Sequence, residues 1–411
     1  MEQATNDRIN QILQPVIERI PESLYGLERQ EFMGKEILKL SDDDRKVLRS
    51  LVDLLLLNMK KLGASDIDMG SFGCKEQVWY RVHGDKKPDE QMGQFGNTQM
   101  NLILLNLLMA RQLEQLIENR NLDFSYNLDI DGAQTRLRAD MYFDLNHIAL
   151  NMRMIGAEIR PFSGFGLHPE ISKALSLKHT KKGLVLITGI TGSGKSSTLD
   201  SIIDANNQTN NAHIVIIGSP IEQVHKSKNC IVRHREVGSD VSSFKEGAIQ
   251  ALRQDPDIIV IGEMRDPETI ITALEVTDSG HKVFSTLHTS SAVESIDRII
   301  GEVPSQEQTR VRERLADVLS VVISQKLPRT LDNKRVLAKE VLLMTPPIRA
   351  AIKNNNLDEI YQMLQQSAKI GMVTMEQDLK RLYEEKKISY EEALANANNK
   401  KRFKEIVVAN I

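Results

Sequence analysis

Residues 189–196 have the residue types and the spacing of a segment that binds a triphosphate. Their letters, GITGSGKS, fit the phosphate-loop pattern GxxxxGK[ST]. Glycines let the backbone turn tightly so that its N–H groups point at phosphate oxygens, and the helix that follows adds its positive N-terminal end. The candidate nucleotide-binding residues are Gly189, Thr191, Gly192, Ser193, Gly194, Lys195, Ser196 and Ser197.

Two residues of this loop have separate expected roles. The Lys195 ammonium should reach the β- and γ-phosphates, and the Ser196 hydroxyl should bind Mg²⁺. The alternative is a glycine-rich turn that holds no ligand. The loop follows an apolar, strand-like run and opens a helical pattern, which is the context that the motif requires. We therefore expect ATP and Mg²⁺ as cofactors.

A second acidic site is expected at Glu263, which ends the apolar run 258–261. Phosphoryl transfer to water needs a group that orients the attacking water. A carboxylate at the carboxyl end of a sheet strand, beside the phosphate loop, is placed for that work. The alternative is an ordinary solvated glutamate at a strand end.

Two histidines border a further strand-like run, residues 282–285. His281 precedes the run and His288 follows it, within the letters GHKVFSTLHT. Both could sense the γ-phosphate, although surface histidines would give the same letters. A metal site at this pair is not favoured, because no third ligand is near in the sequence.

The elements that must position these residues are those of an α/β domain. Continuous apolar runs at 184–187, 214–217 and 258–261 are typical of parallel strands buried on both faces. Helical patterns lie between them, at 196–205 and 243–254. After about residue 305 the pattern turns helical, and the apolar residues between 311 and 323 fit one helix face.

The whole chain divides into five parts by its residue patterns. Residues 1–48 are expected to form a helical N-terminal extension and residues 49–155 a smaller α+β domain, in which 101–119 reads as one long helix. Residues 156–166, rich in glycine, are the linker candidate. The ATPase domain follows at 167–305, and residues 306–411 are the helical C-terminal region.

Composition argues against several classes of protein, although a local basic patch is compatible with it. The 411 residues include 53 basic and 56 acidic side chains, so the net charge of −3 gives no overall field for nucleic acid. Cys74 and Cys230 lie far apart, which favours free thiols in a reducing cytoplasm. No apolar stretch approaches the ~20 residues of a spanning helix, so we expect no direct membrane insertion.

The motifs together resemble the secretion ATPase superfamily, and within it the PilT-like ATPases of type IV pilus retraction. After the phosphate loop come Ser219-Pro220-Ile221-Glu222, then Gly262-Glu263 and Thr286-Leu287-His288-Thr289, in the family's order. The similarity covers about residues 50–400. It implies a RecA-like core preceded by a PAS-like domain, with a helical C-terminal region.

The resemblance also implies roles for single residues. Glu263 would be the catalytic glutamate, and His281 and His288 fall in the family's histidine box. Arg136 and Arg138 match a strand whose arginines approach nucleotide across a subunit boundary, although ordinary surface charge is equally compatible with them. Glu222 joins Ser196 as a candidate for holding Mg²⁺.

This sequence also departs from the family pattern. Gly218-Ser219 stands where the family usually has an acidic pair that helps to position Mg²⁺ and water. Phe143 stands where an arginine is common, and the helix ending at Lys353 differs from the usual retraction helix. These changes leave nucleotide binding intact but put the rate of hydrolysis in doubt.

The function implied by the resemblance is a homo-hexameric motor for pilus retraction and twitching motility, or for a related secretion machine. Its partners would be an inner-membrane platform protein and a paralogous ATPase, and it would lie at the inner face of the cytoplasmic membrane. One alternative is a nucleotide-binding accessory subunit with weak turnover. Another is a nucleic-acid translocase, against which the even charge and the 4% aromatic content argue.

Overall fold

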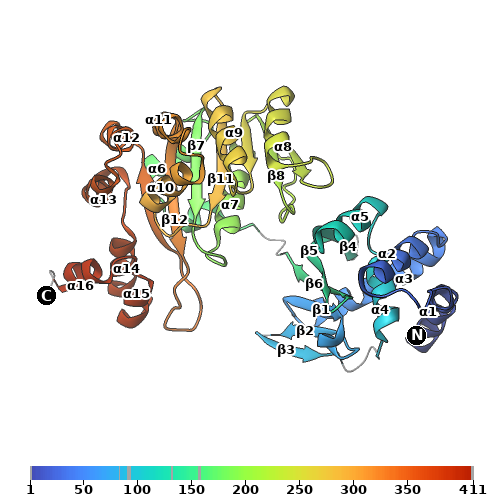
Figure 1. Cartoon of the computed structure of the whole chain (residues 1–411). Coiled ribbons are helices and arrows are strands. Elements are labelled where there is room, and N and C mark those ends of the chain that lie inside the picture. Colours follow the sequence, from blue (N-terminus) through green and yellow to red (C-terminus); the bar gives the residue numbers. More distant parts are fainter. Residues whose placement is uncertain (1, 83, 90–93, 131–132, 156–158, 409–411) are drawn as a thin grey trace. The chain divides into compact units, whose positions relative to one another are not determined.

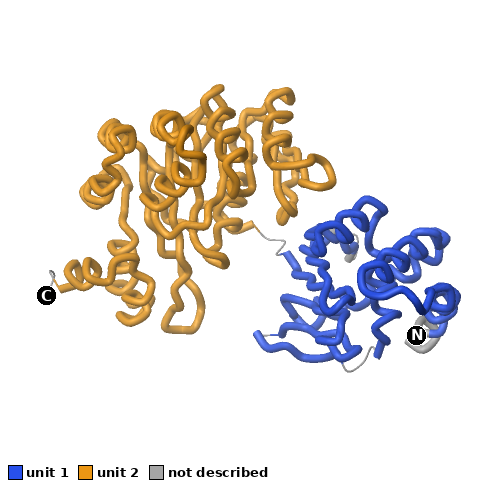
Figure 2. The backbone as a smooth tube through the Cα atoms, viewed as in Figure 1, with its two compact units in different colours: residues 1–157 blue, residues 158–411 orange. Residues whose placement is uncertain are grey.

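The chain forms two compact units, residues 1–157 and 158–411 (Figure 2). The computed structural model describes residues 2–82, 84–89, 94–130, 133–155 and 159–408. Residues 156–158 of the expected linker lie outside the described residues. Short 3-10 helices occur in both units. The first unit has one at Phe72–Cys74, and the second unit has others at Phe162–Phe165, Leu252–Gln254 and Ala368–Ile370.

The first unit combines helices with an antiparallel sheet, as the α+β prediction requires (Figure 1). The strand order is β3-β2-β1-β6-β5-β4. The strands are β1 (Asp66–Gly70), β2 (Trp79–Val82), β3 (Asp85–Pro88), β4 (Asn121–Ile130), β5 (Ala133–Asp144) and β6 (His147–Met154). The helices are α1 (Glu2–Glu18), α2 (Gly26–Ile37), α3 (Asp42–Lys61), α4 (Asn97–Leu105) and α5 (Ala110–Asn119).

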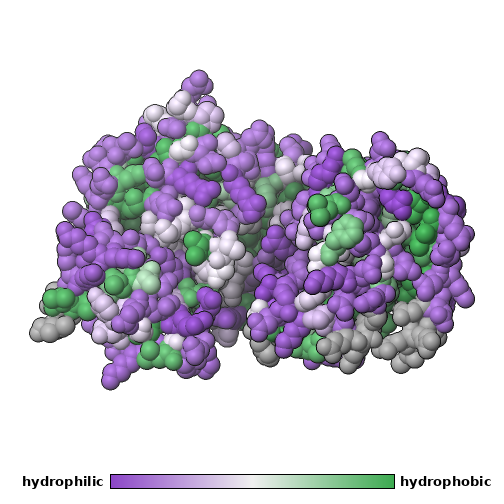
Figure 3. Space-filling view, turned by 60° about the horizontal axis from the view of Figure 1, so that its bottom comes forward, coloured by the Kyte–Doolittle hydropathy of each residue, from purple (hydrophilic) through white to green (hydrophobic). Residues whose placement is uncertain are grey.

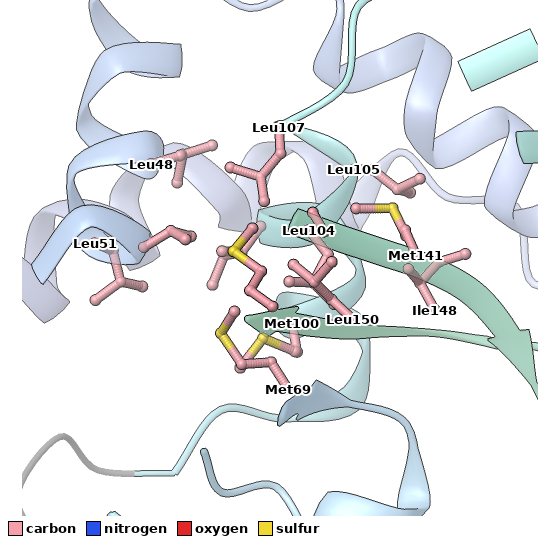
Figure 4. Packing of buried hydrophobic residues seen from close by; sticks show 14 of the residues in the cluster. Leu48, Leu51, Met69, Met100, Leu104, Leu105, Leu107, Met141, Ile148 and Leu150 are labelled. Carbon is pink, nitrogen blue, oxygen red and sulfur yellow. The ribbon is translucent and has the colours of Figure 1, made fainter. Parts of the chain in front are cut away.

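The core of this unit is aliphatic and draws on both helices and sheet. Leu48 and Leu51 of α3 meet Leu104 of α4 and Leu150 of β6 in one buried cluster (Figure 4). Leu13, on the first helix, belongs to the same cluster. Residues 1–48, which the sequence sets apart, therefore share the core of the first unit.

The prediction of one helix over 101–119 was wrong. The chain leaves the helix after Leu105, where the Asn106 side chain donates to the Arg45 carbonyl and accepts from the Arg45 guanidinium. A new helix starts at Ala110. Tertiary hydrogen bonds thus override the apolar periodicity on which the prediction depended.

The second unit is built on a seven-stranded sheet of order β13-β12-β7-β11-β10-β8-β9. Every neighbouring pair is parallel except β12 with β13. The strands are β7 (Gly183–Thr188), β8 (His213–Gly218), β9 (Ile231–Glu236), β10 (Ile258–Ile261), β11 (Lys282–Leu287), β12 (Leu319–Lys326) and β13 (Ala338–Leu343). The α/β prediction for this region is confirmed, with all four predicted strands present.

Helices cover both faces of this sheet, which explains why its strands read as continuous apolar runs (Figure 1). On one face lie α6 (Pro169–Leu175) and α7 (Lys195–Thr209). On the other lie α8 (Phe244–Ala251), α9 (Pro267–Asp278), α10 (Ala292–Glu302), α11 (Gln308–Val318), α12 (Pro346–Lys353) and α13 (Leu357–Gln366).

The C-terminal region is mostly helical, as expected, but it also contributes two strands to the sheet. The helix face predicted for 311–323 ends at Val318, and β12 begins at Leu319. Val321, Val322 and Ile323 are consecutive β-branched residues, which suit a strand buried on both faces. The chain ends with α14 (Met375–Glu384), α15 (Tyr390–Asn396) and α16 (Lys400–Val408), which form a small cluster of their own.

Among the described residues, no helix is long and apolar enough to cross a membrane. On the face drawn in Figure 3, hydrophilic residues predominate and hydrophobic ones are scattered between them.

Candidate nucleotide site

The candidate site lies where the parallel strands of the second unit end. The loop 189–194 follows β7, Glu222 follows β8, Glu263 follows β10 and His288 follows β11. Because these strands run in one direction, their carboxyl ends meet at one edge of the sheet (Figure 1). The register β7-β11-β10 brings Glu263 to the loop from a strand about 70 residues later in the chain, at the edge where ligands bind in open α/β sheets.

The loop has the backbone geometry of a phosphate cradle. Gly192 and Gly194 have φ of 79° and 86°, in the left-handed region where a side chain is strained. A Cβ on Gly189 would lie 2.3 Å from Ser193 Oγ and 2.6 Å from the Gln325 carbonyl oxygen. The loop can therefore be this tight only with glycine at position 189, and α7 begins directly after it at Lys195.

Lys195 is held inside this loop. Only 9% of the residue is exposed, and Nζ donates to the carbonyl oxygens of Gly189 at 2.8 Å and Ile190 at 3.1 Å. Burial lowers the pKa of Lys195, while the charges of Glu263 and Glu222 act to raise it. Both carboxylates are thus near enough to stabilise the ammonium, as expected for residues that share one site.

Glu263 stands between two basic side chains. Its Oε2 is 2.8 Å from Nε of Arg265 and 3.9 Å from Nε2 of His288, and its side chain is 18% exposed. Burial lowers the pKa of His288, and the positive charges of Lys195, Arg265 and Arg298 lower it further. At neutral pH His288 is therefore an uncharged imidazole that can donate or accept a hydrogen bond.

The loop after β8 carries the departure from the family pattern. Gly218 is buried, and a Cβ there would lie 2.7 Å from Cδ1 of Ile221. A carboxylate from the neighbouring strand β9 holds this loop: Oε2 of Glu236 accepts from the Ile221 N–H at 3.0 Å. Glu236 thus positions the residue next to Glu222, a role that motif reading did not assign.

Gln325 is the second residue that sequence reasoning missed. It is 1% exposed on β12, and its Nε2 donates to the Ser193 carbonyl at 2.7 Å. Its side chain also lies 3.2 Å from the Cβ position of Gly194. The apolar run before Gln325 is the available signal, but its spacing also fits a helix face, which is what the sequence predicts there.

His281 does not join the site within this chain. It precedes β11, and its carbonyl oxygen accepts from the N–H of Gly183, the first residue of β7. A strand rises about 3.3 Å per residue, so the six residues of β11 place His281 about 20 Å from His288. Nδ1 of His281 is bound locally, 3.0 Å from Oγ of Ser279 and 3.2 Å from the carbonyl oxygen of Val276. Within one chain, two histidines at opposite ends of a strand cannot both contact the phosphates of one nucleotide.

With this geometry established, comparison with known proteins decides the family. The family model described as type II/IV secretion system protein matches residues 41–407. The chain belongs to this family.

Relatives of this secretion system protein include pilus ATPases. The type IV pilus retraction ATPase PilT of Pseudomonas aeruginosa is 36% identical over 353 residues, which cover 86% of this chain and 99% of PilT. A twitching motility protein of Neisseria gonorrhoeae is 36% identical over 351 residues, covering 84% and 90%.

Solved structures of the family agree with the fold. The crystal structure of the pilus retraction motor PilT with bound ADP has a TM-score of 0.76 and covers 86% of this chain and 99% of its own. The Legionella pneumophila ATPase DotB is 27% identical with a TM-score of 0.73, covering 88% and 96%. The family assignment and the recognition of a PilT-like ATPase are therefore confirmed.

The two candidate arginines lie in the first unit of this family member, on β5. Arg138 is exposed and forms an ion pair with Asp123 of β4 at 3.3 Å, and Arg136 is partly buried. Position 143, where the family often has arginine, is a partly buried Phe143 that packs against the core. A role for Arg136 and Arg138 at a nucleotide stays a prediction.

The family's cofactors fit the residues at the sheet edge. Ser193 Oγ is buried without a hydrogen-bond partner among the described residues, next to the loop amides. Ser196 is exposed at the start of α7, where its hydroxyl is free to meet a cation. No cluster of three or more His, Cys, Asp or Glu that could hold a metal occurs in the part of the chain described. Ser196 and Glu222 remain the predicted residues for a cation.

Replacing Gln325 by leucine should weaken ATP binding about three- to tenfold, because a hydrogen bond that fixes the Ser193 carbonyl is lost. The change is measured as the Kd for ATP by calorimetry. Gln365→Leu, an exposed glutamine on α13, is the matched control and should leave the Kd unchanged. An unchanged Kd in folded Gln325→Leu protein would show that Gln325 does not support the loop.

Proposed function

We propose that this protein is an ATPase motor that drives type IV pilus retraction, or a closely related secretion machine. The observation that carries the proposal is the meeting of a lysine-bearing phosphate loop with Glu263 at one sheet edge. It is supported by 36% identity to PilT along almost the whole PilT chain. The Lys195 ammonium points into the loop, where it donates to the carbonyl oxygens of Gly189 and Ile190.

Each residue at the edge has one part in hydrolysis. The amides of the loop and the Lys195 ammonium hold the β- and γ-phosphates. Ser196 and Glu222 are the residues that would hold Mg²⁺, and the ion would supply positive charge to neutralise the phosphates. Glu263 orients the attacking water and accepts its proton, while Arg265 keeps the carboxylate in place at 2.8 Å. Neutral His288 offers a hydrogen bond beside it.

The working form that we propose is a homo-hexamer. Arg136 and Arg138 of one chain would approach the nucleotide of another and neutralise charge that develops on the transferred phosphoryl group. Residues 156–166 would act as a hinge during each cycle. The ring would act on an inner-membrane platform protein, alongside a paralogous ATPase, from the cytoplasmic side of the membrane.

A second candidate is a nucleotide-binding accessory subunit with weak turnover. It is favoured by Gly218, where Ile221 occupies the space that a larger side chain would need. A carboxylate at this position would require the loop to move. The two candidates differ in turnover and agree in nucleotide binding.

Glu263→Gln should lower steady-state phosphate release about a hundredfold or more and leave the Kd for ATP within about threefold, because the carboxylate acts on water rather than on nucleotide. Phosphate release and calorimetry on the same preparations measure the two effects. Glu268→Gln, an exposed glutamate at the start of α9, is the control.

Negligible phosphate release by the unaltered chain, together with tight ATP binding, would contradict the motor and favour the accessory subunit. Turnover that survives Glu263→Gln would show that another group orients the water.

The arginine proposal is tested by mixing variants. Chains with Arg136→Ala and Arg138→Ala hold nucleotide but lack the arginines, and chains with Lys195→Ala have the reverse defect. Each variant measured alone should release phosphate about a hundredfold or more slowly than the unaltered chain. Rings assembled from both variants should regain part of the rate of phosphate release.

Arg111→Ala, an exposed arginine on α5 of the same unit, is the control for loss of positive charge. Co-assembled rings that are no faster than the two variants measured separately would contradict action between subunits.

A further inference from the structure

The second unit holds a cavity of about 530 Å³ that no phosphate-loop residue lines. Its walls come from three parts of the chain that are far apart in the sequence: residues 164–168, certain residues between 336 and 341, among them Leu337, and certain residues between 368 and 387, among them Gly371 and Arg381. The volume lies within the range of small-molecule sites.

One largely buried, charged side chain in this cavity forms no hydrogen bond or ion pair through its charged group within the part of the chain that the structure describes. Lys339 of β13 is 9% exposed and lines the cavity. Its backbone N–H donates to Oδ2 of Asp378 at 2.9 Å, but among the described residues its Nζ has no hydrogen bond or ion pair. Most of this side chain is buried, and the charge of Asp378 acts to stabilise its ammonium, but no acceptor from the described ranges is bound to Nζ. An anionic ligand in the cavity would supply that acceptor.

The nearest carboxylate is already engaged. Asp378 Oδ1 accepts from Nε and Nη2 of Arg381, both at 2.8 Å, while its Oδ2 accepts from the Lys339 N–H. Arg381 and Lys387, which also line the cavity, share Glu385 at 2.9 Å and 2.8 Å. The polar groups left to meet a ligand are therefore mainly donors and positive charges.

His168, which also lines the cavity, adds a further donor. Its Nδ1 accepts from the Glu170 N–H at 3.2 Å, so in the neutral ring the proton is on Nε2. The ring packs directly on Gly371, where a Cβ would lie 2.4 Å from Cβ of His168. Glycine at 371, with φ of 91°, is thus needed for this wall.

The remaining lining is apolar. Phe165, Leu167, Val341 and Leu382 are among the residues that face the cavity. Inorganic phosphate alone would leave this apolar surface uncovered, whereas a ligand with an apolar body would bury it.

We propose that this cavity binds a small organic anion, a phosphate or carboxylate carried on an apolar body, whose charge pairs with Lys339. This site is separate from the nucleotide site and does not depend on the function proposed above. Burial lowers the pKa of Lys339, and an anionic ligand would counter that effect by stabilising the ammonium. The bound ligand would also join residues 164–168 to α14.

The test compares two probes of one shape, 1-naphthyl phosphate and uncharged 1-naphthol, by fluorescence titration of the full chain. A saturating non-hydrolysable ATP analogue keeps the phosphate loop occupied. The unaltered chain should bind the phosphate about tenfold more tightly than the alcohol, because only the phosphate pairs with Lys339. Lys339→Met should abolish this preference and leave 1-naphthol binding unchanged. Lys369→Met, an exposed lysine outside the cavity, should preserve the preference.

Leu337→Trp fills the cavity while keeping Lys339, and it should remove binding of both probes from protein that circular dichroism shows to be folded. This variant tests the site even if Lys339→Met fails to fold. Equal affinity for the two probes, a preference that survives Lys339→Met, or binding undiminished in Leu337→Trp would overturn the proposal. So would the absence of saturable binding by either probe.

Discussion

The parallel pairing of β7 with β11 and β12 is the constraint on which the candidate site depends. Parallel strands present their carboxyl ends together, so the residue that follows each strand is brought to the same edge. Residues 188 and 287 are aligned partners, as are residues 261 and 285 one strand further along. A change of pairing direction at any of these strands would move its terminal side chain to the opposite edge, where His281 lies.

Charge balance at that edge follows from the same pairing. Lys195 is buried in its own loop, a position that disfavours an ammonium unless negative charge is near. Glu263 and Glu222 supply that charge, and Glu263 is itself close to Arg265 and His288. A triphosphate would bring more negative charge to the loop, to which the ammonium and the loop amides are suited to respond.

The sequence predicted the parts of the site that are contiguous in the chain. The phosphate loop and Glu263 each sit at the end of a run of apolar residues, so local pattern places them correctly. Gln325 could not be found this way, because Val318, Leu319, Val322 and Ile323 fit a helix face as well as a strand, and only pairing with β7 decides between them. The separation of His281 from His288 was hidden for a different reason: the two are near in sequence, but a whole strand lies between them. The cavity around Lys339 needs three distant segments to form, and no local pattern encodes it.

The central claim is that the loop at 189–196 holds a triphosphate through Lys195. Calorimetric titration of ATP into the purified chain, with Mg²⁺ present, tests it most directly. The account predicts saturable binding, with Lys195→Ala raising the Kd between about ten- and a hundredfold, since a charge-assisted contact is removed. Absence of binding by folded protein, or an affinity that Lys195→Ala leaves unchanged, would contradict it.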